Sequence, residues 1–293
     1  MEWTERMSAA VDYIENNLTG EVDFHEAARK ANCSPFHFSR IFTIVTGVTL
    51  SEYVRRRRLT LAASELSHGK AKVIDVALKY GYDSPDAFTR AFRNVHGITP
   101  MAAREPGVQL VAYPRIFFQI VLTGGKDMDY QIIEKPAFEV VGEIKKISTV
   151  NNVNFIEVPR FWDEFIEKGH IDTLMDLSQC KPGPVTGASD IGICIPIKNT
   201  MDAFTYMIAI EKPDKEIPGE FEILTIPEAT WAVFESIGPM PDAIQKVWKG
   251  IFQEWFPSTG YKHAEKPELE VYFPGDPQSP DYRCQVWIPI KEK

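Results

Sequence analysis

The residues with the clearest chemical potential are two arginines at equivalent positions of a repeated segment. Segments 34–49 and 84–99 are identical at 8 of 16 aligned positions. Helical spacing places one arginine of each copy on a polar face, opposite an apolar face. An arginine among short polar side chains on a helix suits a DNA major groove. The predicted outward residues are Phe36, Ser39, Arg40 and Thr43 in the first copy and Asp86, Thr89, Arg90 and Arg93 in the second.

Each copy is predicted to be a helix because capping residues mark both of its ends. A serine followed by proline begins each copy, at Ser34 and Ser84. Glycine stands where a left-handed residue would end each helix, at Gly47 and Gly97.

A shorter helix is predicted before each copy, at residues 23–31 and 73–80, with a turn of two or three residues between the two helices. This order is the helix-turn-helix arrangement, in which the second helix reads DNA. A long helix from about residue 49 to 67 connects the two units. We expect it to hold the reading helices about 34 Å apart, which is one DNA turn.

Residues 5 to about 105 resemble the seven-helix DNA-binding domain of AraC/XylS-type transcriptional regulators. The segments that carry the resemblance are Ala27-Ala28, Ser34 to Phe42, Gly81-Tyr82, Ser84 to Phe92 and Gly97 to Pro100. The resemblance implies base or phosphate contacts at Phe36, Ser39, Arg40, Asp86, Thr89 and Arg90. Asp86 departs from the amide often seen in this family and repels phosphate, so the second helix either reads weakly or accepts from a cytosine amino group.

The run Arg55 to Arg58 has two interpretations. It could clamp phosphates, but four consecutive helical residues point around the whole circumference of the helix. Surface ion pairing is therefore the favoured interpretation.

Composition indicates a soluble, cytoplasmic protein of two or more domains. The chain has 293 residues, 44% of them hydrophobic, and no apolar leader or run long enough to span a membrane. The cysteines Cys33, Cys180, Cys194 and Cys284 lack the paired spacing of metal sites, so we predict reduced thiols, no metal and no cofactor.

The net charge of -9 is unevenly distributed. Residues 1–105 carry +1 and the remainder carries -10. A nearly neutral domain can bind DNA if its basic groups face one way, with a moderate and salt-sensitive phosphate contribution.

The predicted domains are a DNA-binding domain at 1–105, a connector at 106–126 and an effector domain at 127–293. The connector contains β-rich stretches between 108 and 122 and a loop signal at 123–127. Because its apolar residues would otherwise be exposed, we expect it to pack on the C-terminal domain.

A weaker repeat runs through the C-terminal part. Segments 130–143 and 221–235 each read as a strand pair bent at a proline, followed by an amphipathic helix and two more strands. The fold class predicted is an N-terminal all-α double helix-turn-helix domain followed by an α+β domain. The latter would hold two strand-helix-strand-strand repeats around an antiparallel sheet.

Residues 127–293 resemble the GyrI-like effector domain, through Glu268 to Tyr272 and Cys284 to Ile290. The resemblance implies a cleft between the repeats that takes up lipophilic, often cationic, small molecules. Alternation along the strands converges Glu270 with Tyr272 and Gln285 with Trp287, and Tyr206 and Trp231 come from the matching region. Gln285 stands where many relatives carry glutamate, so Glu270 is the expected counter-ion.

Three functions remain open from the sequence. The favoured one is a non-enzymatic transcription regulator that binds double-stranded DNA and responds to a small-molecule effector. One alternative is implied by the resemblance, because some GyrI-like domains are similar to hydrolases acting on strained-ring toxins, in which a glutamate and a tyrosine could serve as acid/base and orienting groups. The other is a docking module whose acidic surface binds RNA polymerase or another basic partner. No membrane partner is expected.

Overall fold

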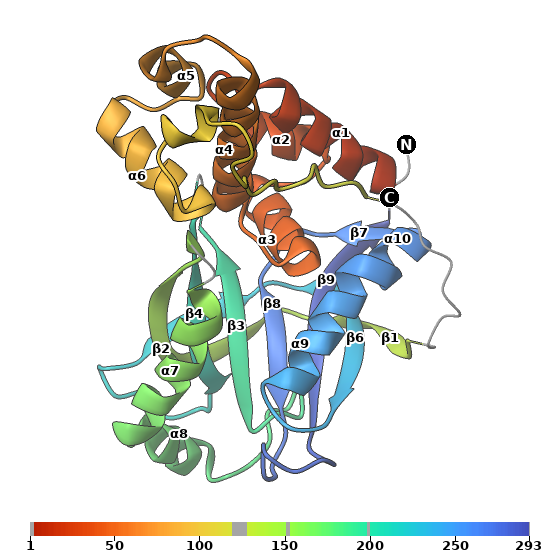
Figure 1. Ribbon diagram of the computed structural model, residues 1–293. Coiled ribbons are helices and arrows are strands. Elements are labelled where there is room, and N and C mark those ends of the chain that lie inside the picture. Colours follow the sequence, from red (N-terminus) through yellow and green to blue (C-terminus); the bar gives the residue numbers. More distant parts are fainter. Residues whose placement is uncertain (1–2, 119–127, 151–152, 198–199, 293) are drawn as a thin grey trace. The chain divides into compact units, whose positions relative to one another are not determined.

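The computed structural model describes residues 3–118, 128–150, 153–197 and 200–292 (Figure 1). The chain divides into two compact units, and each is described by itself. The first consists of Met1–Phe38 and Val48–Val121, and the second of Ser39–Gly47 and Leu122–Lys293. Among the described residues, no helix is both long and apolar enough to cross a bilayer.

The first unit is helical, as predicted. Its helices are α1 (Trp3–Asn16), α2 (Phe24–Lys30), the start of α3 (Pro35–Thr46), α4 (Leu50–His68), α5 (Val73–Lys79), α6 (Pro85–His96) and a 3-10 turn, η1 (Ala102–Arg104). The cap predicted at Ser84 is confirmed, because Ser84 accepts from the amide of Ala87 at the start of α6. Thr49 caps α4 in the same way, by accepting from the amide of Glu52. Gly97 is left-handed, with φ of 75°, so local signals set these helix ends.

Helices α4, α5 and α6 share one apolar core that orients α6. Phe88 and Phe92 of α6 are completely buried against Leu59 and Ala62 of α4 and Ala77 of α5. This core leaves the opposite side of α6 in solvent. The predicted inward and outward faces of the second reading helix are therefore confirmed.

The described part of the connector, residues 108–118, bonds to the helices of the first unit. The expectation that it packs on the C-terminal domain is therefore wrong. The amide of Val111 donates to His96 Nδ1 at 3.2 Å, and the amide of Tyr113 donates to Thr60 Oγ1 at 3.0 Å. The amide of Ile116 donates to the Tyr53 hydroxyl. Residues 108–118 form no strand, so side chains of α4 and α6 satisfy this backbone instead. The loop predicted at 123–127 lies outside the described residues.

The arginine run of α4 forms ion pairs and structural hydrogen bonds. Arg55 and Arg56 pair with Glu52, whereas Arg57 pairs with Glu15 at 2.8 Å and also donates to the Tyr113 carbonyl. The Arg57 and Glu15 side chains are 12% and 9% exposed. The favoured interpretation as surface ion pairs is confirmed for Arg55 and Arg56, whereas the ion pair of Arg57 is largely buried.

The second unit contains an antiparallel sheet of nine strands among its described residues. They are β1 (Tyr130–Lys135), β2 (Phe138–Ser148), β3 (Asp190–Pro196), β4 (Ala203–Glu211), β5 (Glu222–Ile226), β6 (Ala229–Ile237), β7 (Tyr261–His263), β8 (Glu268–Tyr272) and β9 (Arg283–Glu292). Their order is β1-β6-β9-β8-β3-β4-β2-β5, with β7 beside β9. The two repeats meet at β8 and β3, and the first strand of each repeat lies at the outer edge of the other. The predicted duplicated α+β architecture is confirmed.

The helices of this unit are α7 (Asn154–Glu167), α8 (His170–Ser178), α9 (Asp242–Gly250), a π-helical turn (Ile251–Trp255) and α10 (Phe256–Ser258). Figure 1 shows α7 and α9 on the same face of the sheet. Phe161 and Phe165 of α7 are buried, whereas Ile166 is 54% exposed. The other face of the sheet carries an apolar core that includes Trp231, Leu269 and Trp287.

Candidate functional site

A buried carboxylate, Glu270, lies at the centre of the helix-covered face of the sheet. The hydroxyl of Tyr206 on β4 donates to Glu270 Oε2 at 2.6 Å, and the hydroxyl of Tyr272 donates to the same atom at 3.0 Å. Trp248 of α9 donates its indole N–H to Oε1 at 2.9 Å. Glu270 is 8% exposed, so these donors replace the water that a buried carboxylate loses.

The helix α7 supplies the other wall of this cluster. Trp162 donates its indole N–H to the Tyr206 hydroxyl at 3.2 Å, and its ring meets Tyr272 edge to face, with centroids 5.3 Å apart. Trp162 and Trp248 occupy the helices of the two repeats. Each repeat therefore contributes an indole to the hydrogen-bonded cluster around Glu270, Trp248 directly and Trp162 through the Tyr206 hydroxyl.

Gly192 of β3 makes the short approach between Tyr206 and Glu270 possible. A Cβ atom at this position would lie 2.1 Å from the Tyr206 hydroxyl oxygen and 2.9 Å from Glu270 Oε2. Both distances are shorter than van der Waals contact. The absence of a side chain at Gly192 thus leaves room for the tyrosine to bond the carboxylate.

Burial keeps the two tyrosines protonated. Loss of solvent, followed by the neighbouring negative charge of Glu270, raises the pKa values of Tyr206 and Tyr272 well above the ordinary 10.0. Both hydroxyls consequently remain hydrogen-bond donors to Glu270 across the physiological range of pH.

The structure brings together only part of the predicted pocket. Tyr206, Glu270 and Tyr272 converge, but Trp231, Gln285 and Trp287 lie on the opposite face of the sheet. The reason is register: Glu270 pairs with Val286, so Gln285 and Trp287 share the face of Val271 and Leu269, their own partners. The predicted convergence of all six side chains is wrong, because a shift of one residue in pairing exchanges the faces of a strand.

The three displaced residues have another arrangement. Trp287 donates its indole N–H to Gln285 Oε1 at 2.9 Å, and the Trp231 and Trp287 rings lie 5.9 Å apart. Trp231 is completely buried in the apolar core. These contacts place Trp231 and Trp287 in packing roles.

A second buried carboxylate, Glu268, lies on the same face of β8. Arg40 Nη2 lies 3.0 Å from Glu268 Oε2, and the guanidinium stands over the Trp248 ring, 4.5 Å from its centroid. The Phe204 ring lies 5.9 Å from the same guanidinium. Residues 39–47 belong to this compact unit, so Arg40 is held between a carboxylate and aromatic faces.

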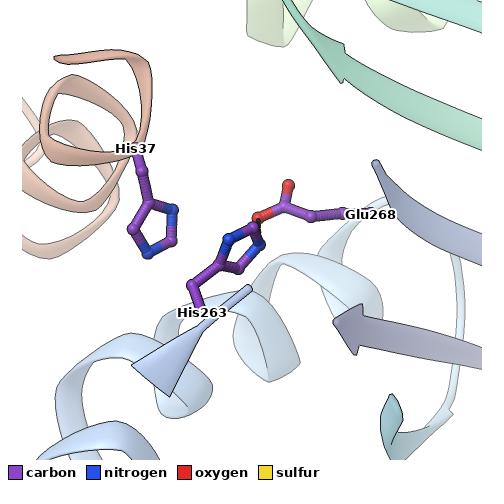
Figure 2. Close-up of side chains that lie close together, drawn as sticks. All are labelled: His37, His263 and Glu268. Atoms are coloured by element: carbon purple, nitrogen blue, oxygen red, sulfur yellow. Dashed lines mark ion pairs between the residues drawn. The ribbon is translucent and has the colours of Figure 1, made fainter. Parts of the chain in front are cut away.

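His263 completes the surroundings of Glu268. Its Nε2 atom lies 3.3 Å from Glu268 Oε1, and Figure 2 shows the ring beside the carboxylate. His37, drawn in the same view, belongs to the other unit. Burial alone would raise the pKa of Glu268, yet the charge of Arg40 and the bond from His263 bring that pKa below its ordinary value. Glu268 and His263 are of types that bind metal ions, but the Arg40 cation on the same carboxylate disfavours a second cation.

Sequence reasoning missed Glu268, Trp162, Trp248 and Phe204. Two signals were present: Glu268 is two residues from Glu270 and so shares its face, and the two tryptophans stand on the helices of the two repeats. The cation–aromatic arrangement of Arg40 had no sequence signal, because its partners lie more than 150 residues away.

The predicted DNA-reading residues fall into two groups. On α6, Asp86, Arg90 and Arg93 are exposed and Thr89 is partly exposed. On α3, by contrast, Phe36, Ser39 and Thr43 are 8%, 7% and 7% exposed, and the Arg40 side chain is 15% exposed. Within residues 39–47, which belong to the second unit, the expected exposure of Arg40 is therefore not observed, because Arg40 has a buried counter-charge there. The DNA contacts of the α3 residues stay a prediction.

Duplicated helix-turn-helix units followed by a duplicated α+β domain define a class of protein architecture. It is the AraC-type helix-turn-helix region joined to a GyrI-like effector-binding domain. A helix-turn-helix domain family matches residues 27–106. The family described as integron-associated effector binding protein matches residues 131–290. That match covers more than half of the chain, which accordingly belongs to the integron-associated effector-binding protein family.

Two curated relatives each match about a third of this chain. The TetD protein of transposon Tn10 from Escherichia coli is 44% identical over 88 residues, which are 30% of this chain and 64% of TetD. The chain thus spans less than two thirds of that relative. The HTH-type transcriptional activator AarP of Providencia stuartii is 38% identical over 98 residues, which are 33% of this chain and 73% of AarP. A solved structure of SAV2435 bound to tetraphenylphosphonium is similar at a TM-score of 0.49 and 24% identity, covering 56% of this chain and 94% of that one.

Proposed function

We propose that this protein is a sequence-specific DNA-binding transcription regulator whose C-terminal domain binds a lipophilic cation. The observation that carries the ligand part is the Glu270 carboxylate, buried beneath aromatic side chains of both repeats. The helix-turn-helix duplication, together with the exposed polar face of α6, supports the DNA part.

The chemistry around Glu270 favours a cation over an anion or a neutral molecule. A buried carboxylate attracts positive charge strongly because little water screens it. The rings of Trp162, Trp248 and Tyr272 add aromatic faces over which a cation can lie. The site therefore combines one negative charge with a largely aromatic wall.

The burial of Glu270 favours cations with a delocalised or shielded charge over compact ammonium ions. A compact ammonium ion loses a large hydration free energy when it enters a dry site. A cation whose charge is delocalised, or shielded by aromatic groups, loses much less. We infer lipophilic cations as the ligand class for this reason.

Entry to Glu270 requires a helix to give way. Tyr206 and Tyr272 donate from strands, whereas Trp248 donates from α9. The strand positions are held by the ladders of the sheet, so displacement of the Trp248 indole is the least costly way to expose the carboxylate. Ligand binding would then be coupled to movement of α9.

Titration calorimetry with tetraphenylphosphonium tests the ligand part, with uncharged triphenylphosphine oxide for comparison. The Glu270→Gln substitution keeps the shape of the side chain and should weaken cation binding at least tenfold. Glu254→Gln, at an exposed position after α9, is the matched control and should bind normally. Equal affinity in wild type and Glu270→Gln would remove the carboxylate from the ligand site. Turnover of a strained-ring substrate, abolished by Glu270→Gln, would instead favour the hydrolase.

Fluorescence anisotropy tests the DNA part, with a duplex selected from a random pool by the full-length chain. Arg90→Ala should weaken binding about tenfold, since one good arginine contact contributes about 1–3 kcal/mol. Arg160→Ala removes another exposed charge, on α7, and should change affinity less than twofold. Similar effects of the two substitutions would contradict α6 as a reading helix.

A further inference from the structure

We propose that Arg40 is a built-in competitor of the effector, so that a lipophilic cation releases this arginine, and with it the reading face of α3, for DNA. The inference rests on the proposed function and adds a regulatory step to the same site. Its subject is the second compact unit, to which residues 39–47 belong.

The surroundings of Arg40 match those expected for the effector. The guanidinium is a planar, delocalised cation, and it sits over the Trp248 ring at 4.5 Å with a carboxylate oxygen of Glu268 at 3.0 Å. Phe204 lies 5.9 Å away on another side. One delocalised cation, aromatic rings and a buried carboxylate are the combination inferred above for the ligand.

Trp248 links the two carboxylates and makes the competition direct. Its ring face carries Arg40, and its indole N–H donates to Glu270 at 2.9 Å. A ligand that reaches Glu270 by displacing this indole also removes the surface on which the guanidinium rests. Binding at Glu270 and retention of Arg40 are therefore mutually unfavourable.

Release of Arg40 without a replacement cation is costly. Glu268 is 2% exposed, and a buried carboxylate that loses its counter-charge is strongly destabilised. An incoming cation supplies a positive charge near Glu268 and Glu270 and so offsets that cost. This argument predicts retention of Arg40 in the ligand-free protein and release when the ligand binds.

Arg40 cannot pair with Glu268 and contact DNA at the same time. Its guanidinium points at Glu268, while α3 residues Ser39 and Thr43 are buried in the same conformation. A contact from Arg40 to a base or phosphate requires loss of the Glu268 pair. Thermodynamic linkage then demands that a ligand favouring release raises DNA affinity, and that DNA raises ligand affinity by the same factor.

The Glu268→Gln substitution in the full-length chain tests the proposal. It removes the charge that holds Arg40 and leaves Glu270, the carboxylate proposed to bind the ligand, and the residues proposed to touch DNA unchanged. Without ligand, Glu268→Gln should bind the selected duplex at least fivefold more tightly than wild type. Tetraphenylphosphonium should tighten DNA binding by wild type but have less than a twofold effect on Glu268→Gln. The Glu254→Gln control should behave as wild type.

Hydrogen exchange of residues 39–47 provides a readout that does not depend on DNA. Exchange should accelerate in Glu268→Gln, and in wild type after tetraphenylphosphonium is added. Phe204→Leu removes one neighbouring ring but no charge, and should shift both readouts in the same direction by a smaller factor. This second variant keeps the test decisive if Glu268→Gln is poorly folded.

The outcomes separate this inference from the proposed function. Unchanged exchange and unchanged DNA affinity in folded Glu268→Gln would overturn the restraint on Arg40, even if tetraphenylphosphonium binds. Absence of tetraphenylphosphonium binding to wild type would overturn both the ligand class and the competition. Tighter DNA binding by Glu268→Gln would still support Arg40 as an internal restraint in that case.

Discussion

Replacement of Tyr206 by phenylalanine removes a single oxygen atom from the centre of the effector domain. That hydroxyl donates to Glu270 Oε2 at 2.6 Å and accepts from the Trp162 indole at 3.2 Å. Tyr206 is 1% exposed, so water does not replace the lost donor. A hydrogen bond to a charged group contributes about 1.5–3 kcal/mol. Because Glu270 keeps two other donors, we expect the free energy of unfolding to fall by about 2 kcal/mol.

The assay is thermal unfolding of the full-length chain, followed by the fluorescence of its tryptophans. In a unit of this size, each kcal/mol corresponds to about 2–4 °C in Tm, so Tyr206→Phe should lower the Tm of the second unit by about 4–8 °C. Tyr272→Phe is the matched control. Its bond is longer, at 3.0 Å, and its side chain is only partly buried, so about 1 kcal/mol is expected.

The ranking of these variants decides the test. A Tm loss in Tyr272→Phe equal to or larger than that in Tyr206→Phe would refute the assignment of Tyr206 as the stronger partner of Glu270. A double-mutant cycle between Tyr206→Phe and Glu270→Gln should give a coupling free energy of about 1 kcal/mol or more. Strict additivity would mean that the two side chains do not interact in solution.

Three further predictions follow from other contacts. Burial lowers the pKa of His96 below 6.5, so its stabilising contribution is present above pH 6.5 and lost as the pH falls toward the depressed value. The free energy of unfolding then falls by at most about 1.4 kcal/mol per pH unit. His96→Phe should flatten this part of a profile of Tm against pH, and an unchanged profile would show that His96 does not cause the pH dependence. Arg57→Met removes the counter-charge of the buried Glu15 carboxylate, which keeps a hydrogen bond from Tyr53, and should cost about 3 kcal/mol in urea unfolding. The exposed Arg55→Met should cost less than about 1 kcal/mol, and equal losses would contradict the burial of the Arg57–Glu15 pair. Gln285→Glu should change tetraphenylphosphonium affinity less than twofold in calorimetry, and a tenfold gain would show that it shares the face of Glu270.

The helical part of the chain was predictable because its signals are local. Thr49 and Ser84 cap helices through amides three residues away, and Gly97 adopts the left-handed conformation that ends α6. Apolar side chains of α6 at helical spacing produced the buried and exposed faces that the sequence indicates. None of these features depends on residues distant in the chain.

The connector was predicted wrongly because its partners are not local. Val111 and Tyr113 bond to His96 and Thr60, which belong to helices at different positions in the sequence. An extended segment with unpaired backbone groups bonds to whatever acceptors the folded structure brings near it. Its apolar composition showed only that it would pack, not against which unit.

By itself, the amino-acid sequence determined the repeats, the helix ends, the duplicated strand order and the presence of Glu270 among aromatic residues. Each of these depends on neighbours within a few residues or on comparison of two segments. Tertiary structure alone decided that Glu270 pairs across the sheet with Val286, and thus which residues share its face. It also decided that Glu268 holds Arg40. Strand register and long-range charge pairing arise when distant segments meet, and periodicity along one segment carries no information about its partner.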